Sequence, residues 1–182
     1  VPERLFHPAE AVAGPVPEAD ELARVLPVLK ELSDLCVSVD TRRPAVMKAV
    51  LDAGASMIND VDALGAPGAL EAVAQSSCGV CLMRKKGEPA TMQQDPHYDD
   101  VVREVKDFLA QRVQAARAAG IAAGRITVDP GFGFGKTVEH NLEILRNMHQ
   151  LASIGPVVAG LSRKSTLGKL TGRPVDERLA GS

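Results

Sequence analysis

The sequence predicts an α/β protein built on a parallel sheet that is buried on both faces. Short apolar runs rich in β-branched residues alternate with longer amphipathic segments, as expected for repeated βα units. No linker rich in Ser, Gly or Pro divides the 182 residues, so we expect one domain with its own core. This pattern leaves a doubly wound sheet and a (β/α)8 barrel open, and both bind ligands at the carboxyl ends of the strands.

Strands and helices can be placed in alternation along the whole chain. We expect strands at 35–39, 56–58, 79–83, 126–128 and 157–159, and helices at 21–32, 44–53, 67–74, 98–119 and 138–152. Pro44 suits the first turn of its helix, and Gly54 and Gly120 suit the ends of theirs. The helix over 138–152 is expected to turn Leu142 and Leu145 inward.

Polar side chains directly follow several of the expected strands. They are Asp40, Asn59, Asp60, Asp129 and, after a short loop, Lys164. In a barrel these side chains would project from different strands toward one mouth. Acids, an amide and a lysine in one mouth suit a flat heterocycle that carries both hydrogen-bond donors and acceptors.

The loop after the fourth expected strand reads Asp-Pro-Gly-Phe-Gly-Phe-Gly-Lys and begins at Asp129. Its three spaced glycines allow a flat ligand to approach the main chain. A Walker loop that ends at Gly135 needs glycine where Pro130 stands, and a dinucleotide fingerprint needs glycine where Lys136 stands. The loop therefore suits a ligand site but matches neither common nucleotide-binding motif.

Each of these polar positions also has a simpler explanation. Asp129 before Pro-Gly favours a turn, and Asp40 with Thr41 could cap the helix that follows. Residues 59–60 could serve loop hydrogen bonds, and residues 162–164 could form a solvated turn. The basic run 84–86 is most simply a solvated loop tip. One shared site explains all of these positions at once, whereas the simpler explanations would all have to hold together.

Composition argues against several classes of partner. The net charge is −2 without a basic block, and aromatic residues make up 3%, so we expect no nucleic acid. No apolar run approaches the roughly 18 residues of a spanning helix, and the first residues lack a signal pattern, so we expect no membrane. Three cysteines suit a reducing cytoplasm.

Neither the cysteines nor the histidines predict a metal or redox centre. Cys78 and Cys81 read as C-x-x-C, but on a strand they face opposite sides, so we expect small buried side chains. The histidines do not cluster at metal-ligand spacing: they are His7, His97, His140 and His149. His140 and His149 fall within an expected helix and are expected to be surface or packing residues.

Several segments together resemble dihydropteroate synthases of the pterin-binding family. They occur in the family's order and are Val39–Thr41, Ile58–Val61, Gly87–Gln93, Asp129–Lys136 and Gly160–Lys164. The aspartate–glycine loop together with Ser162, Arg163 and Lys164 makes the resemblance specific. It runs from about residue 21 to the end, whereas residues 1–20 match poorly.

The resemblance implies a (β/α)8 barrel within residues 1–182 and a condensation in folate synthesis. The reaction joins 4-aminobenzoate to 6-hydroxymethyl-7,8-dihydropterin diphosphate and releases pyrophosphate. By this likeness Asp129 accepts hydrogen bonds from the pterin, Asn59 and Asp40 bind other ring nitrogens, and Lys164 binds the carbonyl side. Asp40, Asp129 and Lys164 are then the catalytic set.

The same resemblance supplies the second substrate, an ion and an assembly. Phe134, Ser162 and Arg163 would line the aminobenzoate side, where sulfonamides compete, and Gly160 would complete the substrate-binding residues. Mg²⁺ would balance the diphosphate charge through oxygen ligands. No protein side chain is expected to be a dedicated metal ligand, and intact members of the family form homodimers.

The chain departs from the family pattern at both ends and after the third strand. The family's Asn-x-Thr-Pro-Asp-Ser-Phe and Thr-Arg-Pro-Gly segments are not found, and residues 5–14 do not replace them. The Arg-x-His pair of its last strand is not found, and Met-Arg-Lys-Lys-Gly stands at 83–87 for Met-His-Met-x-Gly. A barrel usually needs about 250 residues. We therefore expect an incomplete barrel without its first and last βα units, with weak turnover and a tendency to self-associate.

Two other functions remain open from the sequence. One is a pterin-dependent methyltransferase domain that hands a methyl group to a corrinoid partner, against which Ser162, Arg163 and Phe134 weigh. The other is a non-catalytic module that binds pterin, or nothing, and acts by association.

Overall fold

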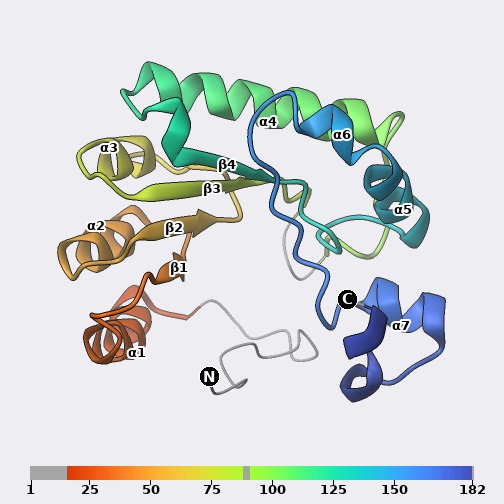
Figure 1. Ribbon diagram of the computed structural model, residues 1–182, viewed down its shortest axis with the longest axis horizontal. Helices are drawn as coiled ribbons and strands as arrows, with labels where there is room; N and C mark the ends of the chain where they lie inside the picture. The colour runs from red at the N-terminus through yellow and green to blue at the C-terminus, as the bar shows by residue number, and fades with distance from the viewer. Residues whose placement is uncertain (1–15, 88–90, 182) are drawn as a thin grey trace.

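A parallel sheet whose strands lie in chain order forms the centre of the protein (Figure 1). The computed structural model describes residues 16–87 and 91–181. Within these ranges the strands are β1 (Ser38–Asp40), β2 (Met57–Asp60), β3 (Gly79–Met83) and β4 (Ile126–Asp129), paired in the order β1-β2-β3-β4. A doubly wound sheet reverses its strand order, whereas a barrel keeps it. The sheet is therefore of the barrel type, which decides between the two architectures left open by the sequence.

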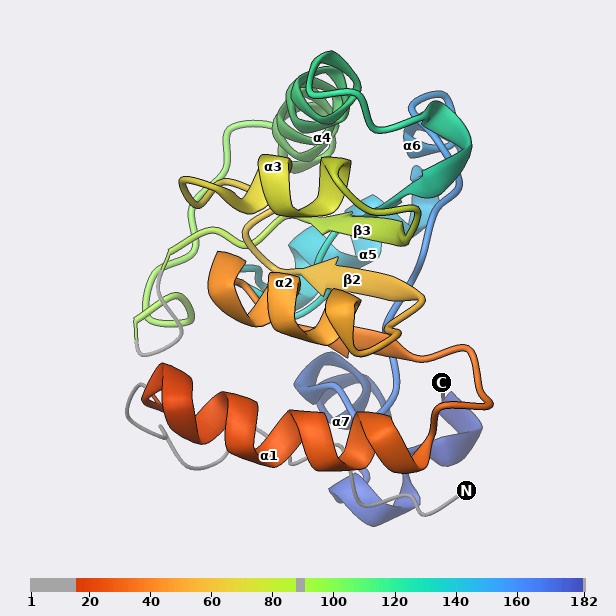
Figure 2. The same cartoon turned by 90° about the vertical axis from the view of Figure 1, so that its left-hand side faces the viewer.

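The helices line one face of this sheet, as on the outside of a barrel. Figure 2 shows α1 to α4 side by side in front of the strands, and neighbouring helices from α1 to α5 contact each other. The helices are α1 (Glu18–Glu31), α2 (Pro44–Asp52), α3 (Ala69–Ala74), α4 (Val101–Ala118), α5 (Val138–Arg146), α6 (Met148–Leu151) and α7 (Ser165–Thr171). Short 3-10 turns are η2 (Ala123–Arg125), η3 (Val175–Glu177) and η4 (Leu179–Gly181).

Side chains alternate between the two faces of the sheet. Val39, Ile58, Val80 and Val128 are buried in the core beneath the helices. The residues that alternate with them face the opposite side. There the register places Asp40 beside Asn59, Asn59 beside Cys81 and Cys81 beside Thr127. The face away from the helices thus carries a row of polar groups near the carboxyl ends of the strands.

The helix boundaries follow from local chemistry. Pro44 occupies the start of α2, where no N–H partner is needed. Asp100 caps α4 by accepting a hydrogen bond of 2.9 Å from the Arg103 N–H. Gly54 and Gly120 follow the ends of α2 and α4 with φ of 98° and 96°, values that few other residues adopt. Both helix ends agree with the sequence prediction.

The helix predicted over 138–152 is in fact two helices. Asn147 separates α5 from α6, and its side chain donates to the Glu143 carbonyl at 2.9 Å, so it competes for a backbone acceptor. The inward positions were also wrong in part: Leu145 is 44% exposed, while Asn141 and Ile144 are buried. The buried side of α5 therefore contains Asn141 and Ile144 in place of Leu145.

Two predicted strands are shorter than the apolar runs that indicated them. The strand expected at 157–159 is a single parallel bridge between Val128 and Val157, bounded by Pro156 and the glycines on either side. β1 begins only at Ser38, and Leu35 is 61% exposed. In both segments the apolar run is longer than the stretch of backbone that pairs with a neighbouring strand.

The cysteines lie as the sequence predicted. Cys78 and Cys81 are buried, Cys36 is exposed, and all three are free thiols. Cys78 belongs to the core beneath the helices, while Cys81 lies in the polar row on the opposite face. Within the described ranges no helix is both long and apolar enough to cross a membrane.

Leu109 and Leu145 provide a matched test of the core. Leu109 in α4 is fully buried, so Leu109→Ala is expected to lower the free energy of unfolding by about 2–5 kcal/mol. Leu145→Ala removes the same atoms from a half-exposed position and is expected to cost less than about 1 kcal/mol. Urea denaturation of both variants checks this difference. Equal losses would contradict the packing described for α4.

Candidate functional site

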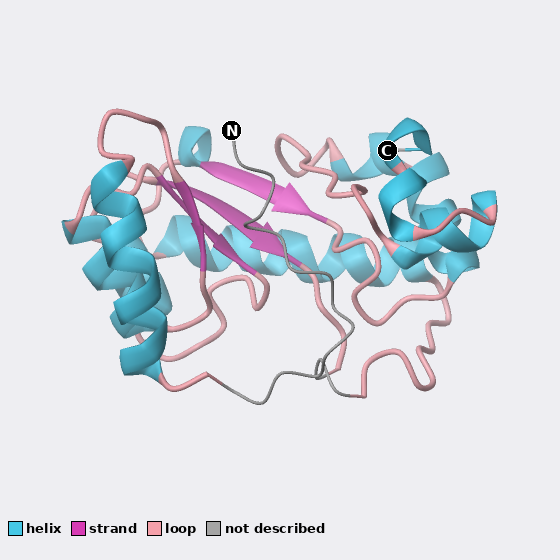
Figure 3. Cartoon of the chain, turned by 90° about the horizontal axis from the view of Figure 1, so that it is seen from below, coloured by secondary structure: helices cyan, strands magenta, loops and turns pink. Residues whose placement is uncertain are grey.

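Asp40 and Asn59 begin the candidate site at the ends of β1 and β2. The Asn59 side-chain amide donates to Asp40 Oδ2 at 3.0 Å across the two strands. Figure 3 shows the arrowheads of the strands at the same end of the sheet. The simpler explanation considered for Asp40 and Thr41, a cap on the following helix, is not found, because α2 has no side-chain cap. Thr41 instead donates to Glu21 Oε1 at 2.6 Å, and this bond ties the end of β1 to α1.

Asp129 ends β4 and is buried. Its Oδ1 accepts a hydrogen bond of 2.7 Å from the Gly131 N–H, so the turn-forming role considered for it is real. A Cβ placed on Gly160 would lie 4.0 Å from the other oxygen, Oδ2. Asp129 therefore fixes the glycine-rich loop with one oxygen and turns the other toward the segment that contains Gly160 and Lys164.

Lys164 completes the convergence. Its ammonium lies 4.2 Å from the centre of the Phe134 ring, within the range of a cation–π contact. Its charge also interacts with both Asp129 and Asp40. Two carboxylates, an amide and a lysine from four separate segments thus surround one mouth, as the sequence predicted.

Burial and mutual attraction act in opposite directions on these ionisable groups. Burial raises the pKa of Asp40 and of Asp129, and the Lys164 charge partly offsets both shifts. Burial likewise lowers the pKa of Lys164, and the two aspartates oppose that shift. Asp129 is buried and therefore poorly solvated, whereas Asp40 is exposed, so a ligand that offers N–H donors can replace the water that Asp129 lacks.

Ser162 and Arg163 are exposed where the chain leaves the mouth. Arg163 has a φ of 59°, a left-handed conformation that is uncommon for residues other than glycine. Gly160 is also exposed. These residues lie beside Lys164 in the chain but are not enclosed by the site, so their predicted roles stay predictions.

Asp60 does not join the mouth, contrary to its place among the strand-end residues. It is fully buried and accepts hydrogen bonds from the backbone N–H groups of Asp62 and Leu64 at 2.8 and 2.7 Å. The alternation of the strand turns Asp60 away from Asn59. Its role is to order the loop after β2.

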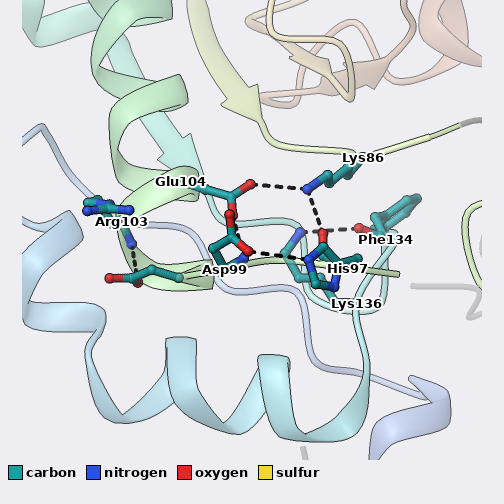
Figure 4. Close-up of polar contacts among 8 residues, drawn as sticks. Lys86, His97, Asp99, Arg103, Glu104, Phe134 and Lys136 are labelled. Carbon is teal, nitrogen blue, oxygen red and sulfur yellow. Dashed lines mark hydrogen bonds and ion pairs between the residues drawn. The ribbon is translucent and has the colours of Figure 1, made fainter. Parts of the chain in front are cut away.

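The basic run 84–86 is not a solvated loop tip, which corrects the simplest prediction. The Arg84 guanidinium lies 4.2 Å from the centre of the Phe108 ring. Lys85 pairs with Asp62 at 3.1 Å and has only 6% of its side chain exposed. Lys86 pairs with Glu104 at 3.1 Å (Figure 4). Their long aliphatic stems cover apolar surface while the charged ends find partners.

The glycine-rich loop packs directly on the backbone that leaves β3. A Cβ on Gly131 would lie 2.1 Å from the Arg84 carbonyl oxygen, and one on Gly135 would lie 2.1 Å from that of Lys86. Both glycines also have positive φ, 71° and 64°. The glycines are therefore required for a close backbone approach as well as for an unusual conformation.

Gly131 and Gly124 offer a matched pair for testing this approach. Gly131→Ala is expected to lower the free energy of unfolding by at least about 2 kcal/mol, because the methyl group collides with a backbone carbonyl at an unfavourable φ. Gly124→Ala has nothing within 4 Å and is expected to change stability by less than about 1 kcal/mol. Thermal unfolding of both variants measures the difference, and a neutral Gly131→Ala would contradict the loop geometry.

A cavity of about 330 Å³ borders this loop at Gly135. It is lined by Lys86, Gly87, Thr91, Met92, Asp95, Pro96, His97 and Gly135. None of the converging residues Asp40, Asn59, Asp129 or Lys164 contributes to it. The candidate site is thus an open mouth at the strand ends, distinct from this cavity.

Comparison with known proteins decides the family. The sequence model of one family, described as pterin binding enzyme, matches residues 8–182. The chain belongs to this family of pterin-binding enzymes. The resemblance found in the sequence is thereby confirmed.

Individual pterin-binding enzymes are similar to the chain over most of its length. Dihydropteroate synthase of Haemophilus influenzae is 42% identical over 174 residues, which are 93% of this chain and 63% of that protein. The structure of the Stenotrophomonas maltophilia dihydropteroate synthase with active-site-bound imidazole is 50% identical with a TM-score of 0.88, and covers 92% of this chain and 65% of that one. The Xanthomonas albilineans enzyme in complex with 7,8-dihydropteroate is 49% identical with a TM-score of 0.85, covering 92% and 63%. The chain thus spans less than two thirds of the length of these relatives.

Sequence reasoning missed one buried charge in this pterin-binding enzyme. Lys136 is 3% exposed, and its amino group donates to the carbonyls of Arg84, Gly131 and Phe134 at 3.2, 3.0 and 3.2 Å. The sequence pattern indicated a ligand-site loop that ends at this lysine, but it did not predict that the lysine is buried. The six residues before Lys136 are proline, glycines and phenylalanines. A lysine that follows such an apolar segment is a candidate for burial.

Proposed function

We propose that the chain is a dihydropteroate synthase. The enzyme joins 4-aminobenzoate to 6-hydroxymethyl-7,8-dihydropterin diphosphate and releases pyrophosphate, in folate biosynthesis. The observation that carries the proposal is the convergence of Asp40, Asn59, Asp129 and Lys164 at one mouth. The names of the similar proteins support it, and one of their structures holds 7,8-dihydropteroate.

The pterin would bind through the polar groups at the strand ends. Asp129 Oδ2 lies toward Gly160, on the open side of the loop, where a ring N–H and the 2-amino group could both donate to the carboxylate. Asn59 and Asp40 would contact other ring nitrogens, and Lys164 would donate to the pterin carbonyl. The buried Asp129 carboxylate then exchanges a poorly solvated state for a complementary partner.

The aminobenzoate would bind on the side of Phe134. The Phe134 ring already contacts the Lys164 ammonium, so the two substrates would meet on either side of that lysine. Ser162 and Arg163, both exposed at the rim, would face the aminobenzoate, with Gly160 leaving room between them and Asp129. Sulfonamides would compete at the same place.

The reaction needs positioning and charge stabilisation more than a protein nucleophile. The arylamine nitrogen attacks the exocyclic methylene carbon of the pterin, the C–O bond to the diphosphate breaks, and the nitrogen loses a proton. Positive charge that develops on the methylene as pyrophosphate departs would be stabilised by the fixed carboxylates of Asp40 and Asp129. Holding both reactants in line supplies much of the remaining rate enhancement.

Magnesium enters this proposal only as the counter-ion of the diphosphate. Among the described residues no three His, Cys, Asp or Glu side chains converge as metal ligands, so this part of the chain does not fit a resident ion. We therefore derive no step through magnesium. A homodimer, a cytoplasmic location and a single pterin-binding domain over residues 1–182 also remain proposals.

Calorimetric titration with 6-hydroxymethyl-7,8-dihydropterin diphosphate and Mg²⁺ tests the pterin site. We expect saturable binding, followed by release of pyrophosphate when 4-aminobenzoate is added. The matched control ligand is the lumazine analogue, which carries a carbonyl in place of the 2-amino group and so presents an acceptor to Asp129. Equal binding of both ligands would contradict the proposed carboxylate contact, and binding without pyrophosphate release would favour a non-catalytic pterin-binding module.

A further inference from the structure

Lys136 is a buried lysine that the proposed reaction does not use. Its amino group donates to carbonyls from two segments, Arg84 at the end of β3 and both Gly131 and Phe134 in the glycine-rich loop. Figure 4 shows its bond to the Phe134 carbonyl. A single amino group thus joins the loop to the backbone that follows β3.

Two of these residues, Gly131 and Arg84, also bind Asp129 through their backbone N–H groups. The Gly131 N–H donates to Asp129 Oδ1 at 2.7 Å, while the Gly131 carbonyl accepts from Lys136. The Arg84 N–H donates to the Asp129 carbonyl at 3.1 Å, while the Arg84 carbonyl accepts from Lys136. Lys136 is therefore connected to Asp129 through two residues, each of which bonds to Asp129 with its N–H and to Lys136 with its carbonyl.

The third bond connects Lys136 to the other side of the mouth. Its acceptor is the Phe134 carbonyl, and the Phe134 ring contacts the Lys164 ammonium. The loop also packs so closely on the backbone at 84–86 that only glycine fits at 131 and 135. Phe132 anchors the loop in the core and the Gly133 N–H donates to Asn141 Oδ1 at 2.9 Å, while the Lys136 amino group fastens the loop to the backbone that follows β3.

We propose that Lys136 is a positioning residue that fastens the glycine-rich loop to the end of β3 and so holds Asp129 and Phe134 in their ligand-facing orientation. Lys136 itself contacts no substrate, because its amino group is enclosed by the three carbonyls. The identity of the ligand in this inference rests on the proposed function, whereas the effect of Lys136 on the order of the loop is independent of it.

Lys136→Met tests the proposal, because it keeps the length and apolar stem of the side chain and removes the donors. Lys86→Met is the matched control: Lys86 lies in the same cluster, 4.0 Å from the Tyr98 ring, but bonds to His97 and Glu104 (Figure 4). Lys136→Met is expected to weaken binding of 6-hydroxymethylpterin diphosphate by about tenfold or more. Lys86→Met is expected to stay within about twofold of the unaltered protein.

Amide hydrogen exchange separates positioning from a general loss of stability and needs no ligand. In Lys136→Met the amides of Gly131, Gly133 and Phe134 are expected to lose protection while those of β3 and of β4 before Asp129 keep it. If the unaltered chain binds no pterin, this readout still decides the role of Lys136. Unchanged loop protection, or an even loss across β3 and β4, would overturn the proposal.

Lys136→Arg serves if the methionine variant does not unfold cooperatively. Arginine keeps the charge but cannot place one nitrogen among three carbonyls, so the same selective loss of loop protection is expected. Full protection and full affinity in Lys136→Arg would also overturn the proposal.

Discussion

Replacing Asp129 with alanine is expected to abolish measurable binding of the pterin substrate. The carboxylate is poorly solvated, and it would receive two charge-assisted hydrogen bonds from the ligand. The loss of two such bonds corresponds to a decrease in affinity of more than about a hundredfold. Calorimetric titration measures it, with Asp52→Ala as a control that removes an exposed carboxylate from α2.

Asp129→Asn distinguishes ligand contact from loop order. Its side-chain oxygen can still accept the Gly131 N–H, so the turn at the end of β4 is kept. Its amide nitrogen, however, presents donors to a ligand that also offers donors. We expect Asp129→Asn to bind pterin nearly as poorly as Asp129→Ala while unfolding at a temperature closer to the unaltered protein. Retained binding in Asp129→Asn would show that Asp129 acts only through the loop.

The sheet could be predicted from the sequence because each strand is short, apolar and followed by a polar residue. The predicted bounds of β3 are its actual bounds. Asp40, Asn59 and Asp129 directly follow the predicted apolar runs, and Lys164 follows its run after a short loop. Parallel strands place such positions at one edge, whatever the details of the loops. The strand order and the one-sided helix layer needed the structure, because local periodicity is the same in a barrel and a doubly wound sheet.

The sequence did not show which face of the sheet each strand-end residue occupies, or which partners the long basic side chains contact. Asp60 follows Asn59 directly, yet a single step along the strand turns it into the core, where it orders the loop after β2. Arg84, Lys85 and Lys86 look solvated in isolation, but α4 and the loop after β2 supply their partners from distant positions. Asn147 divides a helix whose apolar pattern continues past it. For residues 84–86 contacts with remote segments outweighed the local pattern, whereas Asp60 and Asn147 form local hydrogen bonds that the apolar pattern does not reveal.

Lys136 leads to the second large expected effect, a dependence of stability on pH that its methionine variant lacks. Burial, together with the nearby Arg84 charge, lowers the pKa of Lys136 from 10.5 to about 7, while Asp129 opposes the shift. Other groups around it are Lys86, Lys164, Tyr98 and His140. Burial disfavours the ammonium form most, and the neighbouring positive charges add to that effect.

The sign follows from counting protons in the two states. Between pH 7 and 10.5 the lysine of the unfolded chain is protonated while that of the folded chain is mostly neutral, so the unfolded state binds more protons. The free energy of unfolding therefore rises with pH in this window, by up to about 1.4 kcal/mol per pH unit from this group. Below pH 7 both states are protonated and the contribution is flat.

Urea denaturation of the unaltered protein and of Lys136→Met, each from pH 6 to 9.5, measures this contribution by difference. Other groups that titrate in the window are present in both proteins and cancel. We expect the difference in free energy of unfolding to change by about 3 kcal/mol between pH 7 and 9.5 and to be constant below pH 6.5. A difference that stays constant throughout would mean that the three carbonyls hold Lys136 charged in the folded protein. Lys136 would then hold the loop as an ammonium group from pH 6 to 9.5, instead of losing its proton as the pH and the free energy of unfolding rise.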